Sequence, residues 1–514
     1  MCINSTINTV KETLSAIIAF MRQKWHISVI GRLLLIFGVI ILLDITPVQK
    51  TLKLQFHQVK KAMEAGSSSE AARLTAEIAR QIPWRSDLWE QAGDYAWQAG
   101  DYPSAIAYLE QASLAHNLSR EGRLRLADAY IQNGKPYKAE LLLGELLEGD
   151  PSSDIYIRLF QVHRLQKDYP AALRDMLALT EIMPENATHF YLSGLLQMFL
   201  QPEHALDYLQ KASSLNDDFT PTVSAIKYSL LLATQTNNPA QLLITHGRIL
   251  VALQEWELAG EAFRQATLVE PENALAWAFL GEVVQHSNGP ASVYANLYPL
   301  KDTAATPHLA EDAGLAELQK AIALDPQLTA GHVFFSLYWE RHQRFDLALT
   351  AIEKAIHLSP TDAALYSQKG SIQAMLGDLS GALASYQQGV AVSNNDPQAL
   401  KLLLTFCITY EYQLNEAAFP AARNLLQQDL EDPSALDLAG QVLFLQKDPA
   451  AQRYLERALA QDANYAPAHL HLGLLYLQRG DLTRAREKFT LAQSLAPGTV
   501  TASQAQRLLE TYFP

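Results

Sequence analysis

The chain has 514 residues, of which 49% are hydrophobic and 18% are charged, so it can bury a large core and is not a disordered chain. Its formal net charge of −14 argues against nucleic acid as a partner, because binding to phosphates requires a basic surface. The only cysteines are Cys2 and Cys407, which excludes a disulfide framework and a cysteine-based zinc site.

The first strongly apolar segment, ISVIGRLLLIFGVIILL, runs from Ile27 to Leu43. A helix needs about 20 apolar residues to cross a bilayer, and Arg32 lies near enough to the start of the segment to reach the headgroups. A cleaved signal peptide is the alternative, but the following DITPVQK offers no small-x-small cleavage site. We therefore predict a transmembrane anchor at residues 27–45. It is preceded at residues 1–26 by a segment whose apolar residues share one helical face, either on the membrane surface or packed against the span.

The orientation of this anchor depends on the basic residues beside it. Arg22, Lys24 and Arg32 precede or enter the span, whereas Lys50 and Lys53 follow it closely. Counting farther out on both sides removes the difference. The residues nearest the span place the N-terminus in the cytoplasm and the rest of the chain outside it, as a single-pass membrane protein with an extracytoplasmic domain.

A pattern of two short helices joined by a tight turn recurs every 33 or 34 residues from Leu52 to Pro497. One position in the first helix is small: Gly93, Ala127, Gly194, Gly247, Gly281, Ser336, Gly370, Gly440 and Gly473. One position in the second helix is alanine: Ala105, Ala139, Ala172, Ala205, Ala259, Ala348, Ala382 and Ala485. Small residues at these places let the two helices of a pair approach closely. Gly-Asp turns, as at Gly480-Asp481, and prolines that end each repeat complete the pattern.

These residues resemble the tetratricopeptide repeat (TPR). The resemblance covers residues 52–497 and implies an all-α, superhelical solenoid of helix-turn-helix repeats, with the first helices lining a concave groove that binds other proteins. Residues 498–514 then follow as a C-terminal cap helix. The expected fold is thus a TPR solenoid preceded by a single transmembrane helix.

Three segments depart from the repeat. About 20 extra residues lie in an insertion at 286–312, residues 218–237 break the phase with an irregular or extra helix, and Thr409 to Pro420 contains a few extra residues. Insertions in repeat proteins map to loops on one face and are often functional. A tolerated surface insertion is the alternative, because lengthening a loop costs little free energy.

The phase of the repeats also predicts which side chains of the first helices face the groove. At the N-terminal end they are acidic: Asp87, Glu90, Asp94 and Asp128. In the middle they are mostly apolar, with one arginine: Tyr191, Leu195, Met198, Phe199, Ile244, Arg248, Phe279, Phe334 and Leu337. Such a groove suits a partner segment with basic and aromatic anchors. The alternative is that these residues pack against neighbouring helices or form an ordinary solvated face.

No motif for catalysis stands out in the sequence. It contains no phosphate-binding loop, dinucleotide fingerprint or metal-binding histidine pair, so we expect no catalytic residue, no cofactor, no metal and no enzymatic activity. We predict a membrane-anchored scaffold that binds other proteins or peptide segments, in envelope or secretion-related assembly. The alternative is a regulatory or accessory subunit of a membrane enzyme complex, such as one for surface-polysaccharide synthesis, which rests on analogy of fold alone.

Overall fold

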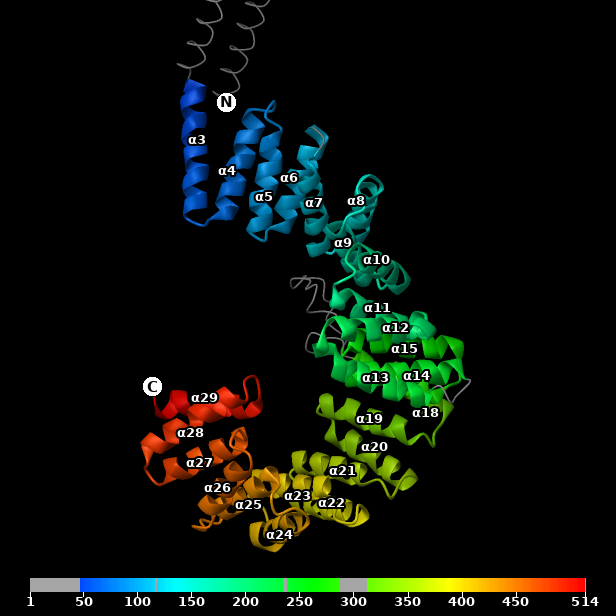
Figure 1. Cartoon of the computed structure of the whole chain (residues 1–514), viewed down its shortest axis with the longest axis vertical. Coiled ribbons are helices and arrows are strands. Elements are labelled where there is room, and N and C mark those ends of the chain that lie inside the picture. The colour runs from blue at the N-terminus through cyan, green and yellow to red at the C-terminus, as the bar shows by residue number, and fades with distance from the viewer. Residues whose placement is uncertain (1–46, 116–117, 234–237, 287–311, 514) are drawn as a thin grey trace, which may run out of the picture. The chain divides into compact units, whose positions relative to one another are not determined.

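The structure is a computed structural model that describes residues 47–115, 118–233, 238–286 and 312–513 (Figure 1). All regular elements in these ranges are helices. The predicted segment 1–26, the predicted anchor 27–45 and residues 287–311 of the predicted insertion lie outside them. Among the helices within these ranges, none combines the length and the apolar character that crossing a bilayer requires.

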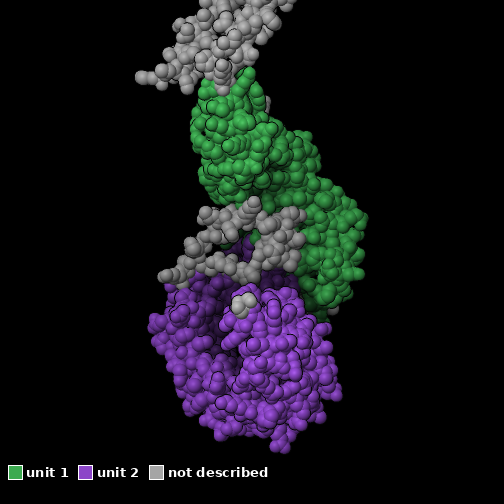
Figure 2. Space-filling model, turned by 90° about the vertical axis from the view of Figure 1, so that its left-hand side faces the viewer, with its two compact units in different colours: residues 1–231, 290–308 green, residues 232–289, 309–514 purple. Residues whose placement is uncertain are grey.

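The chain divides into two compact units, coloured separately in Figure 2, and each is described by itself. Unit 1 contains residues 1–231 and 290–308, and unit 2 contains residues 232–289 and 309–514. The helices of unit 1 are α3 (Pro47–Glu64), α4 (Ser68–Gln81), α5 (Asp87–Gln98), α6 (Tyr102–Ala115), α7 (Arg120–Gln132), α8 (Pro136–Gly149), α9 (Ser153–Leu165), α10 (Tyr169–Ile182), α11 (Ala187–Leu200), α12 (Pro202–Leu215), the 3-10 turn η1 (Asp217–Phe219) and most of α13 (Thr220–Ala233).

Unit 2 continues the series of antiparallel helix pairs. Its helices are α14 (Pro239–Ala252), α15 (Trp256–Val269), α16 (Ala274–Val284), α18 (Leu315–Leu324), α19 (Thr329–Arg341), α20 (Phe345–Leu358), α21 (Ala363–Met375), α22 (Leu379–Val392), α23 (Pro397–Thr409), the π-helix η2 (Leu414–Ala418), α24 (Phe419–Gln428), α25 (Pro433–Leu445), α26 (Ala451–Gln461), α27 (Ala466–Gln478), α28 (Leu482–Leu495) and α29 (Val500–Tyr512).

The small residues of the repeat lie where the two helices of a pair touch. A Cβ atom added to Gly473 would lie 2.5 Å from the Phe489 ring, and one added to Gly247 would lie 2.5 Å from the Phe263 ring. Such distances are far below normal contact, so the large residue of the second helix occupies the space that glycine leaves. On the second helix, Ala485 is fully buried. Close packing within each pair therefore explains the spacing seen in the sequence.

The turns inside the helix pairs require a residue with positive φ. Gly480 has φ of 78° at such a turn, and Asp481 then caps α28 by accepting a hydrogen bond from the backbone N–H of Arg484. Several repeats place a non-glycine residue in the same conformation, including Gln343 with φ of 56° and Lys447 with φ of 58°. The turn geometry is thus retained where the glycine is lost, at a cost in backbone strain.

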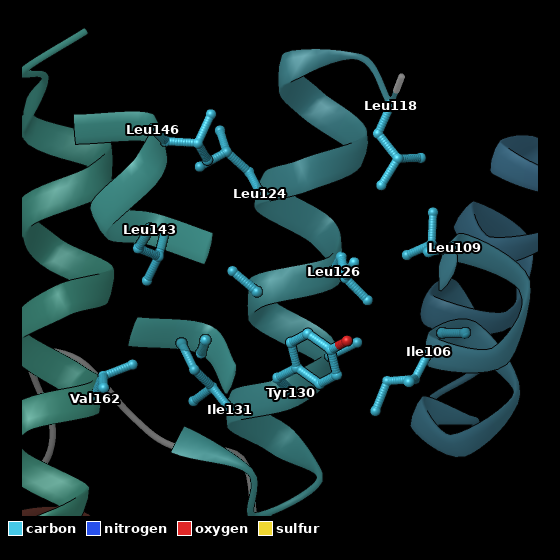
Figure 3. Packing of buried hydrophobic residues seen from close by; sticks show 14 of the residues in the cluster. Ile106, Leu109, Leu118, Leu124, Leu126, Tyr130, Ile131, Leu143, Leu146 and Val162 are labelled. Carbon is cyan, nitrogen blue, oxygen red and sulfur yellow. The ribbon is translucent and has the colours of Figure 1, made fainter. Parts of the chain in front are cut away.

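The core is a continuous layer between successive helices rather than a single centre. Figure 3 shows one part of it, where residues on the two sides of α7 meet different neighbours. Leu126 and Tyr130 point toward Leu109 and Ile106 of α6, whereas Ile131 lies on the other side near Val162 (Figure 3). Each buried leucine or isoleucine contributes about 1.5–3 kcal/mol relative to exposure.

Two of the departures from the repeat fall within the described residues. Part of the segment 218–237 forms η1 and α13, which follow α12 and precede α14 along the chain. The extra residues between Thr409 and Pro420 contain the π-helix η2, which leads directly into α24. Pro420 explains this wide turn, because it has no N–H for a helical hydrogen bond and its ring crowds the preceding turn.

Candidate functional site

The four acidic residues predicted for the groove have partners close by. Asp94 of α5 forms an ion pair with Arg125 of α7, and Asp128 of α7 accepts hydrogen bonds from Arg158 of α9 at 2.7 and 3.0 Å. Glu90 accepts a hydrogen bond from the Ser119 hydroxyl, and Asp87 pairs with Arg85 at 2.7 Å. Burial raises the pKa of Asp94, although the Arg125 guanidinium opposes this shift.

These contacts change the prediction for the N-terminal repeats. The sequence suggested an acidic surface that would attract a basic partner, but Asp94 and Asp128 are each neutralised by an arginine from the next first helix. The side chains of both ion pairs are about three quarters buried, so salt weakens these pairs less than it weakens exposed ones. The ion pairs join α5, α7 and α9, and contact of these acidic residues with a partner stays a prediction.

Five of the apolar residues predicted for the groove are buried. They are at most 3% exposed: Tyr191, Leu195, Met198, Phe199 and Ile244. The Tyr191 ring stacks on Phe219 with centroids 4.5 Å apart, and the Phe199 ring meets the edge of Tyr169 at 5.7 Å. The prediction that these five residues line an open groove is wrong. Helix α11 is covered along most of its length, so its apolar residues form core rather than surface.

Three predicted residues do come together on first helices of unit 2. The guanidinium of Arg248 in α14 lies 5.8 Å from the centre of the Phe279 ring in α16, and that ring lies 5.1 Å from Phe334 of α19. Arg248 is exposed, while Phe279 and Phe334 are half-buried. Leu337, also half-buried, follows Phe334 by one turn of α19. The structure thus places Arg248, Phe279 and Phe334 in one cation–aromatic cluster on the inner side of the repeats.

An open cavity with apolar and polar lining lies farther along unit 2 and was not predicted. It has a volume of about 570 Å³ and is bordered by α23, α25, α27 and α29. We call it the C-terminal groove. Its apolar lining consists of Ile408, Phe444, Leu445, Leu470, Leu474, Leu508 and Tyr512, and its polar lining of Gln441, His471, Gln504, Arg507 and Thr511. Successive helices of this set contact one another.

One buried carboxylate is hydrogen-bonded to two of the polar residues in the wall of the groove. Asp437 is 2% exposed; its Oδ1 lies 2.7 Å from Nδ1 of His471, and its Oδ2 accepts a hydrogen bond from the Gln441 amide at 3.0 Å. These bonds fix His471 and Gln441 in the wall of the groove. At the rim, the exposed guanidinium of Arg507 forms no ion pair or hydrogen bond with any residue that the structure describes. The groove therefore combines an apolar wall with one free cation.

A simple signal in the sequence marks this groove. Ile408, Gln441, Leu474 and Leu508 are 33, 33 and 34 residues apart, and Gln441 and Leu474 directly follow the small residues Gly440 and Gly473. Asp94 directly follows Gly93 in the same way, so the position after the small residue marks both the predicted acidic residues and the lining of the C-terminal groove. The residues predicted for the groove end at Leu337, and residues 498–514 were predicted only as a cap, although α29 also forms a wall of the C-terminal groove.

The lining of the groove suits the binding of a side chain or a short segment. Across the described ranges, no cluster of three or more histidine, cysteine, aspartate and glutamate side chains is arranged to hold a metal ion. Apolar walls with a few directed polar groups are typical of sites that bind a side chain or a short peptide.

Comparison with known proteins identifies the repeat. Family models of the tetratricopeptide repeat match residues 96–161, and residues 244–287, 337–398 and 449–499. No curated protein matches the chain. Among solved structures, yeast Tom70 is similar with 15% identity, covering 90% of this chain and 96% of that chain at a TM-score of 0.37. A tetratricopeptide repeat protein from Parabacteroides merdae is similar with 14% identity, covering 53% of this chain and 98% of that chain at a TM-score of 0.38. YrrB, described as a TPR protein with an unusual peptide-binding site, is similar with 19% identity, covering 38% of this chain and 100% of that chain at a TM-score of 0.26.

Proposed function

We propose that this protein, whose chain carries tetratricopeptide repeats, is a membrane-anchored scaffold that binds segments of partner proteins on the inner side of its repeats. The observation that carries the proposal is the C-terminal groove, with its volume of about 570 Å³ and its walls from four helices. TPR proteins bind other proteins or peptides, and the matched repeats extend to residue 499, at the edge of the groove.

The lining of the groove suggests how a partner segment is held. Leu470, Leu474 and Leu508 offer apolar surface, and covering such surface contributes about 25 cal/mol per Å². The amides of Gln441 and Gln504 are placed to bond the backbone of an extended or helical segment. The free guanidinium of Arg507 favours a segment with a carboxylate near its apolar anchor, because arginine binds carboxylates in a bidentate manner.

The cation–aromatic cluster offers a second contact area on first helices of unit 2. Arg248 is exposed above the Phe279 ring, and Phe334 lies beside that ring. A partner side chain that stacks on Phe334 or pairs with Arg248 would extend the contact made in the C-terminal groove. Several modest contacts along one repeat array raise affinity together when the same partner spans them.

We also propose that residues 27–45 anchor the protein in a membrane and that the repeats lie outside the cytoplasm. The support is the apolar run Ile27–Leu43 in the sequence, which ends only a few residues before α3 begins at Pro47. Reporter enzymes fused after Pro514 test the orientation, because one reporter is active only in the cytoplasm and the other only outside it. Activity of the cytoplasmic reporter would overturn the proposed orientation.

The scaffold proposal is tested by cross-linking the full-length protein in its own membranes. Leu474→Arg places a charge in the wall of the groove, and Leu268→Arg, at a residue that is 66% exposed on α15, makes the same chemical change elsewhere. We expect the partners captured by the wild type and by Leu268→Arg to be lost with Leu474→Arg. Capture of the same partners by all three proteins, at equal thermal stability, would contradict the proposal.

We propose no catalytic activity for the chain itself. The contacts in the groove are those of a binding site, and His471 is committed to Asp437. Turnover of a substrate by the purified full-length protein alone, lost with a change in the groove, would show this part of the proposal to be incorrect.

A further inference from the structure

A second cavity lies on the other side of α25 from the C-terminal groove. It has a volume of about 400 Å³, its walls come from α24 and α26, and its floor contains Ala439 and Leu443 of α25. Gln441 and Phe444, which lie between and beside these floor residues in sequence, face the C-terminal groove instead. We call the second cavity the outer pocket, because second helices of the repeats form its walls.

The local sequence explains why this pocket is open. Most second helices, such as α22 and α28, have 14 residues, whereas α24 has 10 and α26 has 11. Ala439 and Leu443 of α25 are each 5% exposed and form a buried floor between α24 and α26. The π-helix η2 takes up the residues before α24, and its loop is fixed by the Gln446 amide, which donates to the Asn415 Oδ1 at 2.8 Å. The π-helix ends at Ala418, and the next residue, Phe419, has a side chain that is 46% exposed at the pocket.

Arginines concentrate at the outer pocket. Arg423 of α24 and Arg457 of α26 line it, and the guanidinium groups of Arg453 and Arg457 each lie 5.7 Å from the centre of the Tyr454 ring. Arg457 also donates a hydrogen bond to the carbonyl oxygen of Leu430 at 3.1 Å. None of the three arginines has a carboxylate partner among the described residues.

The pocket is locally basic in an acidic chain. The whole protein has a net charge of −14, and arginines elsewhere, such as Arg125 and Arg158, pair with carboxylates. Arg423 and Arg457 line the pocket without such partners among the described residues and give it a local positive field. The exposed side chains of Phe419 and Leu430 add apolar surface beside them, with Leu430 63% exposed.

We propose that the outer pocket binds a segment of a partner protein in which a bulky apolar side chain is flanked by carboxylates. The apolar side chain enters over Ala439 and Leu443 and covers Phe419, while the flanking carboxylates pair with Arg423 and Arg457. A basic segment is repelled by the same arginines, so charge selects the partner. This site shares no lining residue with the C-terminal groove.

Fluorescence anisotropy with the full-length protein in detergent micelles tests the proposal. The probe is a labelled peptide with a central Phe-Leu pair flanked by aspartate and glutamate, and its counterpart carries lysine at the flanking positions. We expect the acidic peptide to bind at least about tenfold more tightly than the basic one, and its affinity to fall with added salt. Equal binding of the two peptides would overturn the proposal.

Matched variants identify where the probe binds. Arg423→Glu and Phe419→Ala should each weaken binding of the acidic peptide by about tenfold or more. The controls are Arg174→Glu on exposed α10 surface and Phe56→Ala, whose side chain is 39% exposed on α3; both should leave binding unchanged. Loss of binding with Leu474→Arg but not with Arg423→Glu would place the peptide in the C-terminal groove and overturn the proposal. A dimer in sedimentation that Phe419→Ala dissociates would overturn it too, since the occupant would then be a second copy.

Discussion

His471 of α27 and Asp437 of α25 are 34 residues apart in sequence, and their side chains meet with Nδ1 2.7 Å from Oδ1. They lie on successive first helices, Asp437 three residues before Gly440 and His471 two residues before Gly473. Asp437 is 2% exposed, and the Gln441 amide donates a hydrogen bond to its other carboxylate oxygen. The pair therefore joins neighbouring repeats under the C-terminal groove.

Removing His471 should leave the Asp437 carboxylate buried with a single side-chain donor. We expect His471→Ala to lower the free energy of unfolding by about 1–3 kcal/mol, the usual cost of a buried polar group that loses its partner. Denaturant unfolding measures the change. His57→Ala, on the exposed surface of α3, is the control and should stay within about 0.5 kcal/mol of the wild type. An equally small effect of His471→Ala would show that its hydrogen bond to Asp437 does not stabilise the contact between neighbouring repeats.

The ion pairs of unit 1 lead to a second prediction. Asp128→Ala leaves the half-buried guanidinium of Arg158 without its bidentate partner and should destabilise the protein by about 1–2 kcal/mol. Asp87→Ala removes an exposed pair with Arg85 and should cost less than about 0.5 kcal/mol. Urea unfolding of both variants checks the difference. Equal losses of unfolding free energy in the two variants would show that burial does not increase the contribution of the Asp128 pair to stability.

The strained turns allow a gain in stability. Gln343 has φ of 56°, a conformation that costs a side-chain-bearing residue about 1 kcal/mol, so Gln343→Gly should raise the free energy of unfolding by about 0.5–1 kcal/mol. The reverse change, Gly480→Ala at φ of 78°, should lower it by a similar amount. Thermal unfolding of the two variants gives the sign directly. A loss of stability with Gln343→Gly would contradict this account of the turns.

The buried pair of His163 and Asp175 predicts a dependence on pH. Burial lowers the pKa of His163, but the hydrogen bond to Asp175 at 2.6 Å and the charge of that residue outweigh it, so the pKa lies above its ordinary value. A raised pKa in the folded state means that protonated His163 stabilises the fold. This contribution is complete below the ordinary histidine pKa of about 6.5 and is lost as pH rises through the higher folded value.

Unfolding measured at several pH values checks this sign. The free energy of unfolding of the wild type should fall as pH rises above about 6.5, and His163→Gln should remove that part of the dependence. His204→Gln is a matched control, because His204 is exposed on α12. The opposite result would be a wild-type stability that rises with pH in this range and a His163→Gln variant without that rise. It would show that the pKa of His163 is lowered in the folded protein.

Cys407 provides a probe of local opening. It is fully buried among the apolar residues of α23, and burial raises the pKa of its thiol to about 11. Since the thiolate is the reactive form, we expect Cys407 in a Cys2→Ser background to resist alkylation at neutral pH until the protein unfolds. Rapid labelling of the folded protein, followed by mass spectrometry, would show that α23 opens readily.

The repeat was predictable because its signals are local. A small residue, a turn residue and a proline at fixed spacing mark each helix pair, and Gly473 against Phe489 shows the contact behind the pattern. The groove was less predictable, since exposure depends on what covers each helix. Leu195 and Leu474 both directly follow the small glycine, but α11 is covered and α27 borders an open cavity. The partners of Asp94 and Asp128 also come from other repeats, which no single repeat reveals.

Helix α25 has 13 residues and is the common wall of two cavities, with Phe444 on one side and Leu443 on the other. A helix packed on both sides cannot shift toward one cavity without changing the shape of the other. Two partners that bind on opposite sides would therefore be thermodynamically coupled without touching each other. If the first partner changes the affinity of the protein for the second by some factor, the second must change the affinity for the first by the same factor.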